Sequence, residues 1–143
     1  MATATLSRSQ SQTQTSAIAP IALLGRLLFA LIFLLAGMNH FASQTIAYAA
    51  SQGVPLAKIA VPLSGAVAIV GGLSILLGYR AKFGGWLIVL FLIGVTPLHN
   101  FWAVTDPMMR QMQMVMFMKN LAMLGGALLI SQFGAGPWSL DNR

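Results

Sequence analysis

The sequence contains no cysteine and no glutamate, and only two aspartates stand against eight lysines and arginines. Without cysteine, disulfides, thiol redox chemistry and thiolate-bound metals are excluded. A non-haem metal site and a serine–histidine–acid hydrolase site are unsupported, because each relies on buried acids that this chain lacks. The Gly-Gly pairs lie inside apolar runs, so they do not form a phosphate-binding loop. We therefore expect no metal site.

Charge of either sign is scarce, at 7% of the 143 residues, whereas hydrophobic residues make up 57%. A soluble domain carries about 25% charged residues. Ten charged side chains could not cover a soluble fold of this size, so the composition indicates an integral membrane protein in a lipid bilayer. The net charge of +6 does not indicate nucleic-acid binding, because the basic residues stand singly at the ends of apolar runs. Such residues orient a chain in the membrane and contact anionic lipid.

Four long apolar runs predict transmembrane helices at about residues 20–41, 59–77, 83–102 and 107–133. Together they predict an all-α, integral membrane four-helix bundle over residues 18–134. Residues 1–17 are rich in Ser, Thr and Gln, and we expect a disordered polar tail there. The first run holds an arginine, which favours an uncleaved span over a signal peptide.

The short connectors between the runs favour up-down-up-down topology. In that arrangement five basic residues lie on the side of the termini and three on the opposite side. The positive-inside rule then predicts that both termini are cytoplasmic, with residues 135–143 forming a cytoplasmic C-terminal tail.

Local signals predict where several helices begin and end. Pro97 is expected to kink the third span near its outer end, with Thr96 helping to satisfy the freed backbone. Asp106 and Pro107 predict the N-cap and first turn of the fourth span. Gly78 is typical of the residue just past a helix end, here that of the second span.

Helical spacing shows which residues of a span share a face. Residues of the first span that share a face, and that we expect to point inward, are Arg26, Ala30, Phe33, Gly37 and His40. Residues of the fourth span that share a face are Lys119, Ala122, Gly126 and Leu129. Lys119 is expected to point into the bundle or up to the interface. Residues 43–51 in the first connector are expected to form a short interfacial helix.

Polar residues gather at the rims of three spans, and the predicted topology brings them to the outer half of the bundle. Ionisable groups inside a membrane are functional candidates. We therefore predict a ligand site formed by Asn39, His40, His99, Asn100, Trp102, Lys119 and Asn120. The alternative is that these residues are ordinary headgroup anchors at helix ends. Two histidines in a bundle also leave haem b open as a ligand, although no other sequence feature supports it.

Several short stretches carry a family resemblance. They include residues 53–55, 61–65 and 70–80, then His99-Asn100-Phe101-Trp102, Asp106-Pro107, residues 116–121 and the closing Ser139-Leu140-Asp141. Across about residues 20–141 the chain resembles the DoxX family. The resemblance implies a multi-pass protein of the bacterial inner membrane. The family takes its name from a subunit linked to a quinol oxidase and to thiosulfate:quinone oxidoreduction.

One feature of related proteins is missing. They often carry a glutamate just before the Gly-Gly of the second span, where this chain has Ala68-Ile69-Val70. A role assigned to that acid therefore does not transfer to this chain.

The leading hypothesis is an accessory component of a membrane redox system that binds a quinone. His99, Asn100 and Lys119 would donate hydrogen bonds to a quinone carbonyl, and Phe101 or Trp102 would flank its ring. The resemblance leaves open whether any reaction is catalysed, and we lean toward no independent catalytic activity. The rival hypotheses are a scaffold or assembly partner for a membrane oxidoreductase subunit, and a small transporter or export factor acting as a homo-oligomer.

Overall fold

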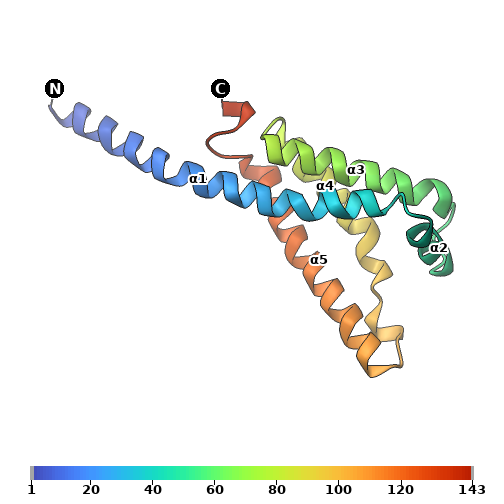
Figure 1. Cartoon of the computed structure of the whole chain (residues 1–143). Helices are drawn as coiled ribbons and strands as arrows, with labels where there is room; N and C mark the ends of the chain where they lie inside the picture. The colour runs from blue at the N-terminus through green and yellow to red at the C-terminus, as the bar shows by residue number, and fades with distance from the viewer. Residues whose placement is uncertain (1, 143) are drawn as a thin grey trace.

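The computed structural model is helical throughout its described part, which comprises the backbone of residues 2–142 and the side chains of residues 18–141 (Figure 1). Its α-helices are α1 (Ala2–Asn39), α2 (Ser43–Ser51), α3 (Ala57–Leu77), α4 (Ala81–Val95) and α5 (Pro107–Phe133). Three short 3-10 helices follow α4 and α5, namely η1 (Thr96–Leu98), η2 (Phe101–Ala103) and η3 (Leu140–Asn142). No strand occurs in these residues, so the predicted all-α class is confirmed.

Four segments are long and apolar enough to cross a membrane. They are Ile18–Asn39, Ala57–Leu77, Ala81–Ala103 and Pro107–Phe133, which correspond to the four predicted spans. Large apolar side chains such as Leu28, Leu63 and Leu90 lie on their exposed surfaces, as expected where lipid is the solvent. The side chains of residues 1–17 lie outside the described part of the chain, so the disorder expected there stays a prediction.

A pair of glycines lets α1 and α3 cross backbone to backbone. A Cβ atom on Gly37 would lie 2.8 Å from the carbonyl oxygen of Gly65, and one on Gly65 would lie 2.7 Å from that of Gly37. In lipid, such close approach is a main source of helix association. The predicted inward face of α1 is confirmed, because Arg26, Ala30 and Phe33 are buried.

A second glycine pair brings α3 against α4. A Cβ atom on Gly71 would lie 3.1 Å from the carbonyl oxygen of Gly84, and the reverse distance is 3.0 Å. Between the two helices, Gly78 adopts a left-handed conformation with φ of +63° and ends α3, as predicted. The very short turn that follows keeps α3 and α4 adjacent.

The third span differs from the prediction at the end that carries Pro97. Instead of continuing as a kinked helix to residue 102, α4 stops at Val95, and His99 and Asn100 leave the helical conformation with ψ of 58° and 68°. Pro97 has no N–H and its ring crowds the preceding turn, which ends the α-helix. The hydroxyl of Thr96 donates to the carbonyl of Leu92 at 2.5 Å, one residue before the carbonyl that Pro97 frees.

The start of α5 is confirmed, and the helix buries a different face from the one that carries Lys119. The carboxylate of Asp106 accepts a hydrogen bond from the backbone N–H of Met109 at 2.8 Å, which caps the helix. The buried residues of α5 are Asn120, Ala127 and Ser131, whereas Leu129, on the face shared with Lys119, is 60% exposed.

The physical reason lies on α4. A Cβ atom on Gly85 would lie 3.0 Å from the carbonyl oxygen of Ala127 and 2.8 Å from the N–H nitrogen of Ser131. This backbone contact determines which side of α5 faces the core. The sequence of α5 alone does not reveal it, because apolar residues occupy almost every side of the helix.

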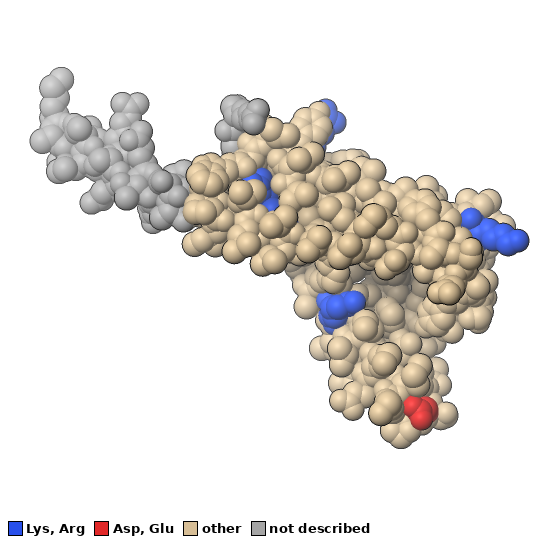
Figure 2. All heavy atoms as spheres, viewed as in Figure 1, with Lys and Arg blue, Asp and Glu red and all other residues tan. Residues whose placement is uncertain are grey.

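The helices form two limbs that diverge along the molecule (Figure 1). The first limb holds α1, α2 and α3, and the second holds α4 and α5. Buried residues that join the limbs are Phe33, Ala68, Ile75, Ile88, Leu92 and Ala127. We call the end that carries α2 and residues 96–106 the connector end, and the end that carries residues 134–142 the tail end. Figure 2 shows the surface hollowed where the limbs part.

Candidate functional site

A cavity of about 550 Å³ lies between the two limbs. Its walls come from α1, α2, α3, α4 and α5, and most of the lining side chains are aliphatic or aromatic. A volume of this size is ordinary for a small-molecule site, where about 300–1,000 Å³ is usual. Its polar lining residues are His40, Thr45, Tyr48, Ser64, His99, Lys119 and Asn120. The limbs therefore enclose an apolar space with a few polar groups concentrated toward the connector end.

Asn120 is the polar residue most enclosed by this cavity. Its side chain is 4% exposed and lines the cavity wall. No hydrogen bond joins its amide to another residue in the described part of the chain. The amide atoms are not among the fully buried atoms without a partner, so they keep accessible surface on the cavity wall. The amide thus has one donor group and one acceptor group available to a molecule in the cavity.

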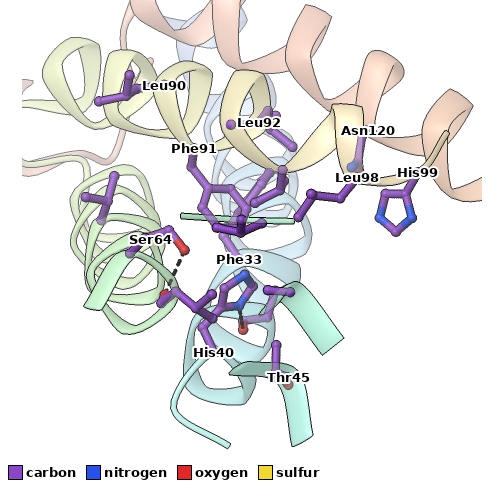
Figure 3. Close-up of a pocket in the computed structure, with 18 of the residues that line it drawn as sticks. Phe33, His40, Thr45, Ser64, Leu90, Phe91, Leu92, Leu98, His99 and Asn120 are labelled. Carbon is purple, nitrogen blue, oxygen red and sulfur yellow. Dashed lines mark hydrogen bonds between the residues drawn. The ribbon is translucent and has the colours of Figure 1, made fainter. Parts of the chain in front are cut away.

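His40 enters the cavity from the α1 side, whereas Asn120 and His99 enter from the α4 and α5 side (Figure 3). The Nδ1–H group of His40 donates to the carbonyl oxygen of Ala36 at 2.6 Å. The ring lies edge-on to Phe91, with centroids 5.4 Å apart. Because Nδ1 carries the hydrogen, Nε2 of the neutral ring is left as an acceptor on the cavity side.

His99 belongs to a polar bridge across the connector end. Its Nδ1 lies 2.7 Å from Oε1 of Gln113, and an amide oxygen accepts, so Nδ1–H donates. The amide nitrogen of Gln113 donates in turn to the hydroxyl of Tyr48 at 3.4 Å. This chain of hydrogen bonds links α2 on one limb to α5 on the other.

Lys119 lies at the rim of the cavity and is exposed. Its ammonium group donates to the sulfur of Met116 at 3.4 Å. The same side chain also lines an open pocket of about 820 Å³ on the outside of α5, together with Phe101 and Arg110. Lys119 can therefore reach either a ligand in the cavity or a negatively charged group at the membrane surface.

The predicted site residues thus divide into two groups. His40, His99, Lys119 and Asn120 line one cavity, which brings together residues from three different helical regions. Asn39, Asn100 and Trp102 do not line it. Trp102 instead packs with Phe101 and Phe117, at ring-centroid distances of 5.1 and 5.9 Å. This aromatic cluster holds η2 against α5 and is not a wall of the cavity.

Sequence reasoning did not identify Gln113, Phe91 and Tyr48 as site residues. Tyr48 lies in a short connector, and Gln113 stands among methionines, which commonly fill apolar helices. Glutamine seven residues before Asn120 lies on the same face of a helix, which is the signal that could have found it. Phe91 carries no such signal, because one aromatic residue in an apolar span is ordinary.

A second polar cluster lies at the tail end. Arg26 is 4% exposed, and its Nη2 donates to the carbonyl oxygen of Trp138 at 2.6 Å. Its Nε and Nη1 have no partner among the described residues. Arg26 points inward, as expected, and the C-terminal tail folds over it, so that a Cβ atom on Gly78 would collide with Nη1.

Asp141 fastens the same tail to α4. Its carboxylate accepts hydrogen bonds from the backbone N–H groups of Arg80 at 2.7 Å and Ala81 at 3.0 Å. These backbone hydrogen bonds, first that of Ala81 and then that of Arg80, lower the pKa of Asp141 below its ordinary value. The carboxylate serves as the N-terminal cap of α4, although it lies 60 residues away in the sequence.

The residues that could hold a metal are few. Among the described residues, no group of three or more His, Asp or Glu side chains is arranged to hold an ion. His40 and His99 both donate through Nδ1 to an oxygen acceptor, which leaves Nε2 of each ring available for another partner. The cavity therefore offers hydrogen-bonding groups around an apolar space.

Comparison with known proteins agrees with this membrane architecture. The family model for DoxX matches residues 21–104. The chain is 28% identical to the inner membrane protein YphA of Escherichia coli over 124 residues, which are 85% of this chain and 88% of that protein. It is 32% identical to the inner membrane protein YqjF of Escherichia coli over 121 residues, 83% of this chain and 88% of that protein.

A more distant relative is the ER-derived vesicles protein ERV29 of Saccharomyces cerevisiae. It is 32% identical over 77 residues, which cover 52% of this chain and 24% of that protein. No solved structure matches the chain. The family model covers more than half of the chain, and the two bacterial relatives are covered almost throughout. The chain therefore belongs to the DoxX family and is a multi-pass protein of the bacterial inner membrane.

Proposed function

We propose that this protein binds a quinone in the cavity between its limbs, as an accessory component of a membrane redox system. The observation that carries the proposal is the amide of Asn120, which is 4% exposed, faces an apolar cavity and has no partner in the described chain. An unpaired polar group on the wall of an apolar cavity favours a ligand that brings a hydrogen-bonding atom to it. A ligand with an oxygen atom on an apolar body satisfies both the amide and the cavity walls.

The other polar groups favour a quinone over a purely aliphatic lipid. A quinone carbonyl accepts hydrogen bonds, which the Asn120 amide and the Lys119 ammonium group can donate. The reduced quinol has hydroxyl groups that donate, and Nε2 of the neutral His40 ring can accept. Phe91 beside His40 supplies an aromatic surface for the ring. Donor and acceptor groups therefore serve both redox forms of one ligand.

Binding of decylubiquinone to the purified protein in detergent tests the proposal, by titration calorimetry of the wild type and of Asn120→Leu. Leucine has a similar volume but cannot form hydrogen bonds. Losing one hydrogen bond of about 0.5–1.5 kcal/mol should weaken binding roughly two- to twelvefold. The same substitution should leave the unfolding midpoint close to that of the wild type, because the amide forms no hydrogen bond within the described chain.

The matched control is Asn39→Leu, which makes the same change at an exposed residue outside the cavity. It should leave quinone binding unchanged. Absence of binding to the wild type would overturn the proposal and would favour a scaffold role, especially if a stoichiometric membrane subunit co-purified. Equal binding by the wild type and Asn120→Leu would remove Asn120 from the site.

A further inference from the structure

Exposed residues of α4 line one side of the cavity, which indicates a gap in the wall there. Leu90 and Gly94 are four residues apart and lie on one side of α4, Leu98 follows in η1, and all three line the cavity. Leu90 is 62% exposed, and Gly94 is exposed. A Cβ atom on Gly94 would meet no atom within 4 Å. Gly94 is therefore not required for packing, unlike the glycines at the helix crossings.

The facing rim of this gap comes from α3. Ala60 and Leu63 line the cavity there, and Leu63 is 63% exposed. Closer to the tail end, α3 and α4 are in backbone contact at Gly71 and Gly84. The two helices are thus in close contact at one end, and the wall between them is open at Gly94.

The surroundings of the gap are apolar and lie within membrane-spanning segments. Both rims belong to spans, Ala57–Leu77 on α3 and Ala81–Ala103 on α4. The rim residues Leu63, Leu90 and Leu98 are all leucines, whereas the polar lining residues of the cavity lie on α1, α2 and α5 and at Ser64 and His99. A mouth with this composition opens onto hydrocarbon, because exposed leucine in a span has lipid as its solvent.

We propose that the gap at Gly94 is a lateral entrance through which the ligand passes between the hydrocarbon of the bilayer and the cavity. This inference rests on the proposed quinone-binding function and specifies the class of ligand. The ring enters toward Asn120 and His40, and a hydrophobic tail extends past Leu63 and Leu90 into the lipid. A ligand with a long apolar tail is therefore accommodated even though the cavity holds only about 550 Å³.

The absence of cysteine makes a direct test available. In Gly94→Cys, the single thiol can be alkylated with a bulky maleimide after the protein has folded and been placed in lipid nanodiscs. The same sample is then measured before and after the entrance is filled. Gly125→Cys is the matched control, because a Cβ atom on Gly125 also meets nothing within 4 Å and Gly125 does not line the cavity.

The quantity to measure is the association rate of ubiquinone-2, followed by stopped-flow fluorescence. Alkylation at residue 94 should slow association by about tenfold or more, because access to the cavity limits the rate. Alkylation at residue 125 should leave the rate within about twofold of the unmodified protein. Far-UV circular dichroism before and after labelling confirms that both proteins stay folded.

The outcomes separate the two proposals. If the wild type does not bind ubiquinone-2, the proposed function fails, and the entrance fails with it. If the wild type binds but alkylation at residue 94 leaves the association rate unchanged, the lateral entrance is overturned while quinone binding stands. If alkylation at residue 125 slows association as much as alkylation at residue 94, the entrance is likewise overturned, because bulk anywhere on the surface would then have the same effect.

Discussion

Asp141 is a single residue that joins two distant parts of the chain, because its carboxylate connects the C-terminal tail to the start of α4. It accepts hydrogen bonds from two backbone N–H groups that the helix itself leaves without partners. The first turn of a helix also favours a negative charge, since the helix dipole is positive there. Both effects stabilise the ionised carboxylate and agree with its lowered pKa.

This lowered pKa predicts a specific pH dependence. The folded chain holds the Asp141 proton less tightly than the unfolded chain, so the carboxylate stabilises the fold above its ordinary pKa of 3.8. That contribution is lost as the pH falls through the lower folded-state value. Asp141→Ala should cost about 0.5–1 kcal/mol at neutral pH, the lower part of the capping range, because the site is exposed.

Thermal unfolding in detergent, measured from neutral pH down through 3.8, tests this expectation. The difference in unfolding midpoint between the wild type and Asp141→Ala should disappear as the pH drops below that value. Asp141→Asn keeps a capping side chain and should show a smaller loss with no pH dependence of its own. A difference in midpoint that stays constant across this pH range would contradict the capping role of the Asp141 carboxylate.

Among single residues, the sequence identified those site residues that are polar but stand in or beside an apolar span. Asn120, Lys119 and both histidines stood out as polar groups in or beside spans, and the cavity contains them. Asn39 and Trp102 stood out for the same reason but lie elsewhere. The difference is one of direction: a helix end can turn a side chain toward headgroups or toward the core, and only tertiary packing decides which.

Among the elements, the crossing of α1 and α3 depends on two glycines, Gly37 and Gly65, which have no Cβ atom. A Cβ atom on Gly65 would lie 2.7 Å from the Gly37 carbonyl oxygen and 2.7 Å from Cβ of His40. Both obstacles are rigid, being backbone or the first atom of a side chain. The helices could accommodate a methyl group only by moving apart, which would also displace His40 from the cavity.

Gly65→Ala is therefore expected to destabilise the protein by about 1–3 kcal/mol, the usual cost of overpacking. The comparison is Gly25→Ala in α1, where an added Cβ atom meets nothing within 4 Å. That variant should be neutral or slightly stabilised, because alanine is the better helix former. Unfolding midpoints of the two purified variants in detergent provide the measurement, and equal midpoints would contradict the close crossing.

Signals within a single helix predicted where helices begin and end. Features that depend on contacts between helices were not predicted. Gly78 and Asp106 act within one turn of their own helix, and both were placed correctly. The inward side of α5 and the early end of α4 depend on neighbours. Gly85 selects the contact face of α5 from across the interface, and an almost uniformly apolar helix carries no pattern from which that choice could be read.

For the whole molecule, the placement of charge predicts an orientation in the membrane. Arg26, Arg80 and Lys82 lie at the tail end, whereas Lys58 and Arg110 lie toward the connector end. The positive-inside rule then places the tail end and both termini in the cytoplasm. This orientation would put the polar side of the cavity in the outer half of the membrane.

Single-cysteine labelling tests the orientation, again without background from native thiols. Ser51 and Tyr79 are exposed and lie at the connector end and the tail end respectively. Ser51→Cys should react with a membrane-impermeant maleimide in intact bacterial cells, and Tyr79→Cys should react only after the inner membrane is permeabilised. The reverse pattern would show that the termini face outward.

The divergence of the limbs was not predictable from the sequence. Four spans with short connectors predict four packed helices, and they do not distinguish a closed bundle from an open one. The opening depends on where backbones touch: α1 and α3 meet at Gly37 and Gly65, whereas α1 reaches α5 through the ring of Phe29 against Gly126. A ring between two helices holds them farther apart than a pair of glycines does.

The contact between Arg26 and Trp138 has a consequence for movement of the C-terminal tail. The two residues are separated by 112 positions, so the Arg26 guanidinium keeps this hydrogen bond only while the tail is folded against α1. A guanidinium within a span is costly unless polar groups of the protein surround it. Displacing the tail would therefore leave the first span with a cation that has lost its carbonyl acceptor, so the energetic cost of the tail's movement is borne at α1.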